Sequence, residues 1–177
     1  MATYARALGR VFDIGLGICT VNLNTGANTG KNISMQNCGG IGVLVFKSAS
    51  GTTDDLAVDL QEVDGYNGTP RDLDVITNYW TKAETALDND EPWVLTTQSA
   101  ASEISAIAGT AEQQIMLYFE VMADMLSDGY THIAVNVPDL GATDSGLGGV
   151  FYIPFDLHIQ RKPANLTSLL RPGVANA

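Results

Sequence analysis

The amino-acid sequence predicts an all-β protein, and two observations lead to that prediction. Residues 151–160 alternate between apolar and polar side chains almost without error. A period of two belongs to the β-strand, so this segment is expected to lie with one face on a core. In addition, about eight such segments follow one another with turn signals between them, and no stretch resembles a crossover helix. We therefore expect an antiparallel sandwich or barrel rather than a parallel α/β fold.

The strand at 151–160 also has a predicted orientation. Its apolar set begins with Phe151 and Ile153 and is expected to face the core, while Tyr152 and its polar companions face away. Pro154 lacks the N–H that a strand contributes to its ladder. We therefore expect an edge position or a local bulge at this proline.

The remaining strand segments are delimited by glycine-rich and polar turns. Residues 41–46 are apolar on both faces and follow Gly39 and Gly40, which predicts a central strand buried between layers. Asn67 and Gly68 predict a tight hairpin turn, because this pair supplies positive φ angles. The expected strands are a weak first strand or arm within 4–22, then 33–36, 41–46, 56–61, 73–82, 93–97, 114–121, 132–137 and 151–160.

Three intervals between these strands lack the alternating pattern of a strand. Residues 98–112 are rich in Ala and Ser, and a short helix and a loop are both open for them. Residues 122–129 predict a helical turn with Gly129 as its C-cap. Residues 138–149 are expected to form a loop.

The expected organisation is an N-terminal arm or first strand (1–22), a β-sandwich domain (23–162) and a C-terminal arm (163–177).

The charges are unevenly distributed. The chain of 177 residues has a formal charge of −11, from 20 acids and 9 bases, and residues 83–160 contain no Lys or Arg. Such an acidic body should repel phosphates, so no nucleic-acid partner is expected. Two interpretations stay open: a solvated acidic surface, and basic terminal segments that dock on an acidic partner. The bases near the termini are Arg6, Arg10, Arg161, Lys162 and Arg171.

No catalytic constellation is recognisable. The two histidines, His132 and His158, both fall on the polar side of a predicted strand, and no Gly-x-Ser-x-Gly motif is present. The histidines and cysteines match no metal-ligand spacing. We therefore expect no enzyme activity, no cofactor and no metal.

Three acidic loops and two tryptophans each allow a structural and a ligand-binding interpretation. For Asp54–Asp55, Asp88–Glu91 and Asp139–Asp144, solvated turn acids are favoured over a loop cation site. Trp80 and Trp93 are favoured as core aromatics over the lining of a sugar-binding groove.

The cysteines and the hydropathy of the chain indicate the cellular compartment in which the protein is expected to be made. Cys19 and Cys38 are interpreted as reduced thiols in preference to a bridged pair. No convincing signal peptide is present, and no stretch approaches the ~18 apolar residues of a membrane-spanning helix. We expect synthesis in a cytoplasm and no membrane partner.

Taken in order, the segments of the chain resemble the capsid decoration, or cement, proteins of tailed bacteriophages, which are encoded beside the major capsid protein. The resemblance covers about two-thirds of the sequence. It lies in Gly26–Thr29, Ile33–Asn37, Ile41–Phe46, Gly51–Asp55, Leu56–Gln61, Asn67–Thr69 and Tyr79–Lys82, and continues from Phe119 through Leu126, Gly129–Tyr130 and Ile133.

This resemblance implies a jelly-roll-like sandwich without catalysis. Such a protein binds the outside of the capsid shell, stabilises contacts between major capsid proteins, and is assembled onto the virion in the host cytoplasm. A homo-oligomer is implied, with a trimer favoured, and the five terminal bases become candidates for the capsid interface. Two alternatives remain: a carbohydrate- or cell-surface-binding β-sandwich, and another phage head or tail component. Burial of both Trp80 and Trp93 would count against sugar binding.

Overall fold

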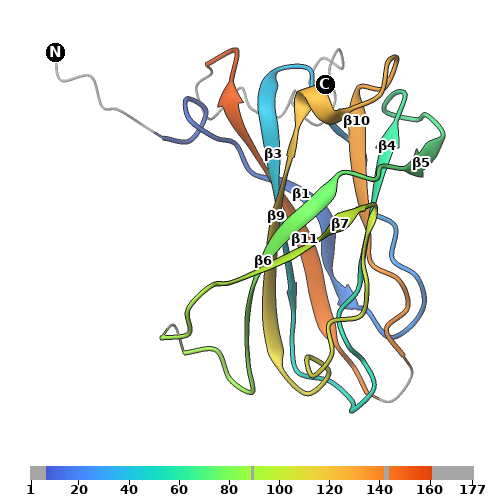
Figure 1. The fold of residues 1–177 in the computed structure, drawn as a ribbon, viewed down its shortest axis with the longest axis vertical. Helices are drawn as coiled ribbons and strands as arrows, with labels where there is room; N and C mark the ends of the chain where they lie inside the picture. Colours follow the sequence, from blue (N-terminus) through green and yellow to red (C-terminus); the bar gives the residue numbers. More distant parts are fainter. Residues whose placement is uncertain (1–6, 89, 142–143, 161–177) are drawn as a thin grey trace, which may run out of the picture.

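Two antiparallel β-sheets pack face to face in the computed structural model, which describes residues 7–88, 90–141 and 144–160 (Figure 1). One 3-10 turn, η1 (Ala123–Met125), follows the ninth strand. The strands are β1 (Gly15–Asn22), β2 (Ile33–Ser34), β3 (Cys38–Lys47), β4 (Val58–Val63), β5 (Pro70–Asp72), β6 (Ile76–Glu84), β7 (Val94–Ala101), β8 (Glu103–Ile104), β9 (Gln114–Met122), β10 (His132–Asn136) and β11 (Leu147–Leu157).

The strand order defines a six-stranded and a five-stranded sheet. The six-stranded sheet runs β1-β11-β3-β9-β6-β7, and the other runs β2-β10-β4-β5 with β8 paired to β4. The prediction of an all-β antiparallel sandwich is confirmed, with eleven strands in the described part of the chain instead of about eight. The jelly-roll-like arrangement stays a prediction.

The core lies between the two sheets and is mainly aliphatic. From the six-stranded sheet, Val43 and Phe119 point inward, and from the other sheet Leu60, Ile133 and Val135 face them; all five are fully buried. Burial of each such side chain stabilises the fold by ~1.5–3 kcal/mol. The prediction of a central strand at 41–46 is confirmed, because β3 lies between β11 and β9.

The predicted orientation of the last strand is wrong. Val150 and Tyr152 of β11 are fully buried, whereas Phe151, Ile153 and Phe155 lie half-buried on the outer face of the sheet. The inward position suits Tyr152 because its Oη accepts a hydrogen bond from the Val135 N–H of β10, 2.9 Å away. The tyrosine thus links the two sheets. Burial raises the pKa of its phenol above its ordinary value.

Pro154 was expected at a sheet edge or at a bulge, but the structure accommodates it in another way. β11 is not an edge strand, because it pairs with β3 on one side and β1 on the other. The pairing with β1 begins only at Gly15, however, which lies opposite Tyr152. Beyond that point the Pro154 carbonyl accepts the Asp13 N–H at 2.8 Å, so the ladder does not require an N–H from the proline.

Several segments are more extended than the sequence indicates. β7 continues to Ala101 and β8 follows, so the first part of 98–112 is neither helix nor loop. β11 begins at Leu147, inside the predicted loop 138–149. The helical turn after β9 is confirmed, but it ends with Leu126 as its C-cap, and Gly129 instead occupies a separate turn with φ 88°.

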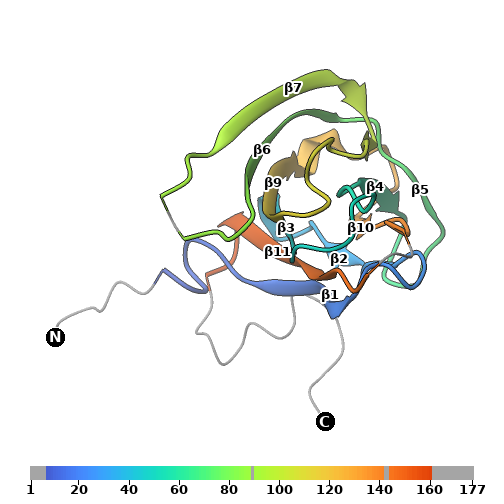
Figure 2. The same ribbon diagram turned by 90° about the horizontal axis from the view of Figure 1, so that it is seen from below.

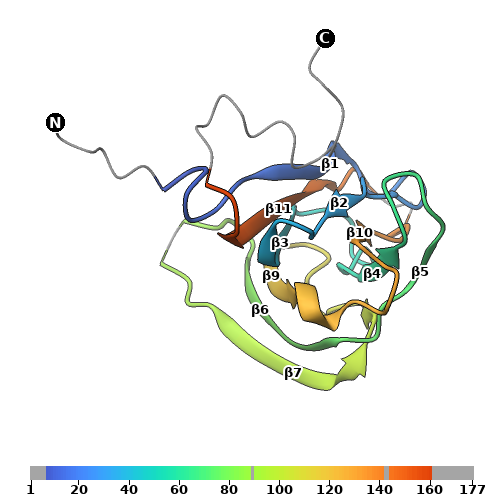
Figure 3. The ribbon, with the colours of Figure 1, turned by 90° about the horizontal axis from the view of Figure 1, so that it is seen from above.

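The six-stranded sheet curves around one side of the molecule. Seen from below and from above, β6 and β7 form an arc with β7 outermost (Figure 2, Figure 3). At the opposite edge, β1 provides the first strand that was expected within 4–22. The segment 163–177, predicted as a C-terminal arm, lies outside the described residues.

Candidate functional site

The outer face of the six-stranded sheet carries an unbroken apolar row. Cross-strand pairing places Phe151 beside Leu44, Leu44 beside Tyr118, Tyr118 beside Trp80, and Trp80 beside Leu95. These side chains are half-buried, except Leu95, which is 53% exposed. Since strand neighbours on one face of a sheet touch, the row forms a contiguous surface across five strands.

The glycines of β3 allow aromatic rings to lie flat on this surface. A Cβ at Gly42 would come within 2.5 Å of the Tyr118 hydroxyl, and one at Gly40 within 2.5 Å of the Phe155 ring. Both strands that flank β3 therefore lean their rings over its bare backbone. Large side chains at these two positions would lift the rings off the sheet.

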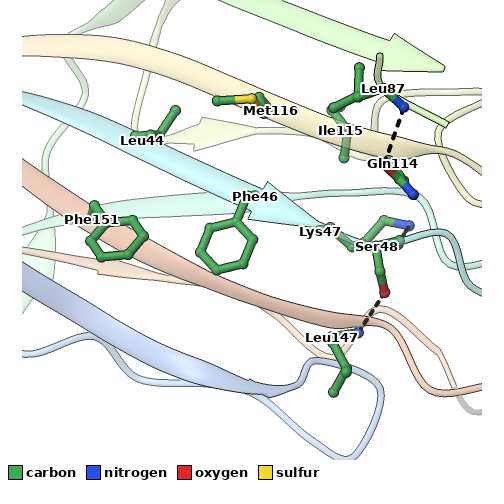
Figure 4. A pocket seen from close by; sticks show the side chains of 10 residues that line it. All are labelled: Leu44, Phe46, Lys47, Ser48, Leu87, Gln114, Ile115, Met116, Leu147 and Phe151. Carbon is green, nitrogen blue, oxygen red and sulfur yellow. Dashed lines mark hydrogen bonds between the residues drawn. The ribbon is translucent and has the colours of Figure 1, made fainter. Parts of the chain in front are cut away.

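A groove of about 500 Å³ crosses this face at the end of β3 (Figure 4). The Phe46 and Phe151 rings stack at its centre, 5.8 Å apart with 20° between their planes. Leu44, Met116 and Leu147 complete the apolar walls, and Leu147 is 50% exposed. We refer to the space lined by these five side chains as the apolar groove.

Lys47 lines one end of the groove but directs its charge elsewhere. Its Nζ donates to the carbonyls of Ser48 and Ala111, at 3.1 and 2.9 Å, and to Ser50 Oγ at 3.1 Å. Burial lowers the pKa of the ammonium group, and the carboxylates of Asp54 and Asp55 partly oppose this shift. The lysine therefore secures the loops below the groove and contributes no charge to its surface.

The side chains of the two other polar residues of the groove also form hydrogen bonds with the backbone. Ser48 Oγ accepts the Leu147 N–H at 2.9 Å, and Gln114 Oε1 accepts the Leu87 N–H at 3.1 Å (Figure 4). With these groups satisfied, the groove presents mainly carbon atoms. Its chemistry suits the binding of apolar side chains, and its ten lining residues include no carboxylate, imidazole or thiol.

Of the five predicted interface bases, the structure describes Arg10. Its side chain is exposed, and its Nε donates to Gln160 Oε1 at 3.3 Å, which joins the two ends of the described chain. Arg6, Arg161, Lys162 and Arg171 lie outside the described residues. Whether the five bases form one interface thus stays a prediction.

The expectation that both histidines lie on the polar side of a strand is wrong for His132. This residue is buried, its Nδ1 lies 2.8 Å from Thr131 Oγ1, and its Nε2 has no hydrogen-bond partner. Burial lowers the pKa of the imidazole. His158 is exposed near the end of β11. His132 therefore belongs to the packed interior.

The acidic loops have divided roles. Asp54 is fully buried and accepts hydrogen bonds from Asn24 and from the Gly51 N–H, while Asp55 accepts the N–H groups of Thr110 and Ala111 at 2.8 and 2.9 Å. These two carboxylates organise loops, contrary to the expectation of solvated turn acids. The 139–144 loop is described only in part.

The remaining acidic loop forms a cluster at the surface. Carboxylate oxygens of Glu84, Asp88, Asp90 and Glu91 lie within 4.8 Å of one another. A hydrogen bond with Glu91 raises the pKa of Glu84, and desolvation adds to the shift. The negative charges of Glu91, Asp88 and Asp90 raise it further. The cluster remains compatible with solvated acids, and nothing around it indicates a bound cation.

The tryptophans are not core residues, contrary to the prediction. Trp93 is 43% exposed, with Lys82 Nζ 5.4 Å from its ring centroid. Trp80 is half-buried on the outer face, 6.1 Å from Tyr118 and tilted by 45°. The burial that would have counted against sugar binding is thus not observed.

The two cysteines are unpaired, as predicted. Cys19 is exposed on β1, whereas Cys38 is buried, which raises the pKa of its thiol to about 11.

Among the described residues, no helix is both long and apolar enough to span a bilayer. Neither a protein-family model nor a curated protein sequence matches the chain.

Proposed function

We propose that this protein is a virion structural protein that binds the outside of a phage capsid shell and stabilises contacts between major capsid proteins. The supporting observation is the contiguous apolar face of the six-stranded sheet, with the groove around Phe46 and Phe151 at the end of β3. Exposed apolar surfaces of this kind mark interaction sites, and aromatic side chains supply much of the energy in protein interfaces. The role requires no catalytic group.

The rigidity of the face suits such a role. The rings lie on a sheet whose other side is fully packed, and the polar atoms at the groove are held by backbone hydrogen bonds. Little conformational entropy is lost when a preorganised surface binds. Repetition over many identical shell sites would multiply a modest interface per copy into a large total stabilisation.

The terminal segments provide a second point of attachment in this proposal. Residues 7–160 contain all 20 acids but only five of the nine bases, while 161–177 contains three bases and no acid. A basic segment of this kind is attracted electrostatically to an acidic partner surface. Deletion of residues 163–177 is expected to leave the sandwich folded and to weaken attachment to the particle.

The test is binding of the purified protein to shells that lack it, together with its stoichiometry in purified particles. Phe151→Ala is expected to reduce shell binding at least about tenfold, because it removes half of the stacked ring pair. Met125→Ala is the matched control, since Met125 is 43% exposed at the opposite end of β9. Absence of the chain from particles, or equal binding by both variants, would refute the proposal.

Carbohydrate or cell-surface binding is kept as a second candidate because of Trp80 and Trp93. One is half-buried beside Tyr118 and the other is 43% exposed, so aromatic surface is accessible to a sugar ring. Quenching of tryptophan fluorescence by a glycan panel, lost in Trp93→Ala and retained in Phe151→Ala, would favour this candidate. Assignment to another phage head or tail component is distinguished by the location of the chain in a particle reconstruction.

A further inference from the structure

The four outer edges of the two sheets differ in how they are protected against pairing. An edge strand exposes a row of backbone N–H and C=O groups, and proteins usually block such edges with short strands, charges, prolines or bulges. Of the described strands, β1 and β7 form the edges of the six-stranded sheet. In the other sheet β2 forms one edge, and β5 together with the two-residue β8 forms the opposite one.

Three of these edges are blocked. β2 has two residues, and β5 has three, Pro70, Arg71 and Asp72, of which two are charged and one is proline. β1 is longer, but its register with β11 shifts twice, and the Gly17 carbonyl accepts the Lys31 N–H at 3.0 Å from the adjacent loop. Each of the three edges therefore shows a recognised obstacle to strand addition.

β7 is irregular only at its far end, where its register with β6 shifts between the pairs Asn78–Thr97 and Ile76–Ala101, whereas Val94–Thr97 pair regularly. Its eight residues, Val94–Ala101, contain no charge and no proline, and among the described strands it pairs only with β6. Its side chains are exposed or half-buried along the whole strand, including Val94 at 56% and Leu95 at 53%. The strand stands outermost in the curved sheet (Figure 2). An uncharged, proline-free edge is unusual for a strand that stays unpaired.

We propose that β7 pairs antiparallel with β7 of a second copy of this chain, which joins the two six-stranded sheets into one continuous sheet across a two-fold axis. This inference does not depend on the identity of the shell partner. It commits to an assembly of two copies, whereas the resemblance favours a trimer.

Self-pairing is favoured over an unrelated strand because β7 is complementary to itself. A two-fold axis places each strand antiparallel to its own sequence, so a charge near the axis would meet the same charge of the other copy. The absence of charge from Val94 to Ala101 removes that conflict. The acids nearest the strand, Asp90 and Glu91 before it and Glu103 after it, lie beyond its ends.

The apolar row on the outer face gives a second reason. Leu95 ends the row that runs from Phe151 through Leu44, Tyr118 and Trp80. A two-fold axis perpendicular to the sheet puts the outer faces of both copies on the same side, so the two rows lie on one face of the joined sheet. Leu95, 53% exposed in one copy, is then partly covered by the other.

The pairing has a consequence for attachment. Two copies in one sheet present two apolar grooves in a fixed relation on the same side. Binding of the first groove raises the effective concentration of the second, which strengthens attachment without new contacts. Because each copy has a formal charge of −11, added salt is expected to strengthen the pair by screening their repulsion.

The experiment introduces charge on the exposed outer side of β7. Thr97 and Ser99 are both exposed. Alternation puts Thr97 on the same face as Leu95, and Ser99 lies in the stretch where the register of β7 shifts. The double variants Thr97→Lys/Ser99→Lys and Thr97→Glu/Ser99→Glu place like charges across the axis in any register centred on these residues. Each alone is expected to weaken self-association by about tenfold or more, measured by sedimentation equilibrium.

An equimolar mixture of the two variants separates pairing from misfolding. Opposite charges then face each other, and a heterodimer is expected to form at least as tightly as the native pair, detectable by native mass spectrometry. Thr20→Lys on the exposed part of β1 is the matched control and is expected to leave association unchanged. Thermal melts of the single variants verify that each is folded.

Four results would overturn the proposal. They are a native protein that is monomeric at high concentration, a trimer that is indifferent to charge on β7, loss of association in the Thr20→Lys control, and failure of the Lys and Glu variants to pair with each other. Loss of shell binding with an intact β7 pair would instead count against the proposed function alone, so the two proposals fail separately.

Discussion

The two faces of the six-stranded sheet are both apolar, yet only one is closed. On β3, Val43 points inward and is fully buried, while Leu44 and Phe46 point outward and remain half-buried. On β11, Tyr152 is inside and Phe151 outside. The inner face is built mainly from branched aliphatic residues, together with Phe119, Tyr79 and the hydrogen-bonded Tyr152, and packs tightly against a second sheet. The outer face carries rings laid over glycines, and the described part of the chain leaves these rings only half-buried. Apolarity alone therefore does not identify the core.

The largest expected difference between the two faces is in how much the free energy of unfolding falls when an aromatic ring is removed. Phe119→Ala on the inner face is expected to lower the free energy of unfolding by ~3–5 kcal/mol, because it leaves a cavity between two sheets. Phe151→Ala on the outer face should cost about 1 kcal/mol, since the half-buried ring is already open to solvent. Urea denaturation of both variants measures the contrast. Similar losses would mean that the outer face is covered in the free protein.

A smaller effect tests the link between the sheets. Tyr152→Phe keeps the ring but removes the hydroxyl that accepts the Val135 N–H, 2.9 Å away in β10. The buried N–H is then left without that acceptor, and the free energy of unfolding should fall by ~1–3 kcal/mol. Hydrogen exchange at Val135 supplies a local measurement, because its protection should drop more than that of core amides elsewhere. An unchanged stability would show that the link is dispensable.

The smallest effect concerns the second sheet and depends on pH. Glu62 is buried, its Oε1 lies 2.6 Å from Arg71 Nη2, and its Oε2 accepts the Ser127 N–H at 2.9 Å. Burial alone would raise the pKa of Glu62, but the hydrogen bonds from Ser127 and Arg71 outweigh it and lower the pKa. A carboxyl with a lowered pKa in the folded state contributes stability above its unfolded pKa, and that contribution is lost as the pH falls through the folded pKa.

Arg71→Gln is therefore expected to reduce the free energy of unfolding at pH 7 by ~1–2 kcal/mol, a value discounted for the partial exposure of the guanidinium. The acid loss of stability should also begin at a higher pH than in the native protein, because Glu62 has lost one partner. Denaturation curves at several pH values measure both effects. Lys31→Gln, at an exposed base, is the control, and an equal shift there would point to net charge instead of the ion pair.

Much of the fold was predictable because period and turn chemistry are local properties. The alternation in 114–121 and 132–137 corresponds to β9 and β10, and the two-sided apolar run 41–46 corresponds to the central part of β3. The strands whose extent was missed are those that lack apolar alternation. β5 and the far end of β7 consist of polar or small residues, and only pairing with a neighbour makes them extended.

The candidate site was less accessible to sequence reasoning. The terminal bases drew attention because of their charge, while the apolar face was assigned to the core. A signal was nevertheless present in β11, where the apolar set includes Phe151 and Phe155 but its polar counterpart includes Tyr152 and Pro154. Together with the glycines of β3, this indicates a strand with apolar residues on both sides, of which only one side can face a single neighbouring sheet.

The sequence by itself determined that the chain forms short antiparallel strands with an acidic surface, since side-chain period, glycine turns and charge are properties of the residues alone. Only the tertiary structure decided which face of each strand is inside, which rings lie over which glycines, and which edge is left open. The physical reason is that alternation defines two faces of a strand without assigning them. The assignment follows from packing against a second sheet, and that sheet is built from residues far away in the chain.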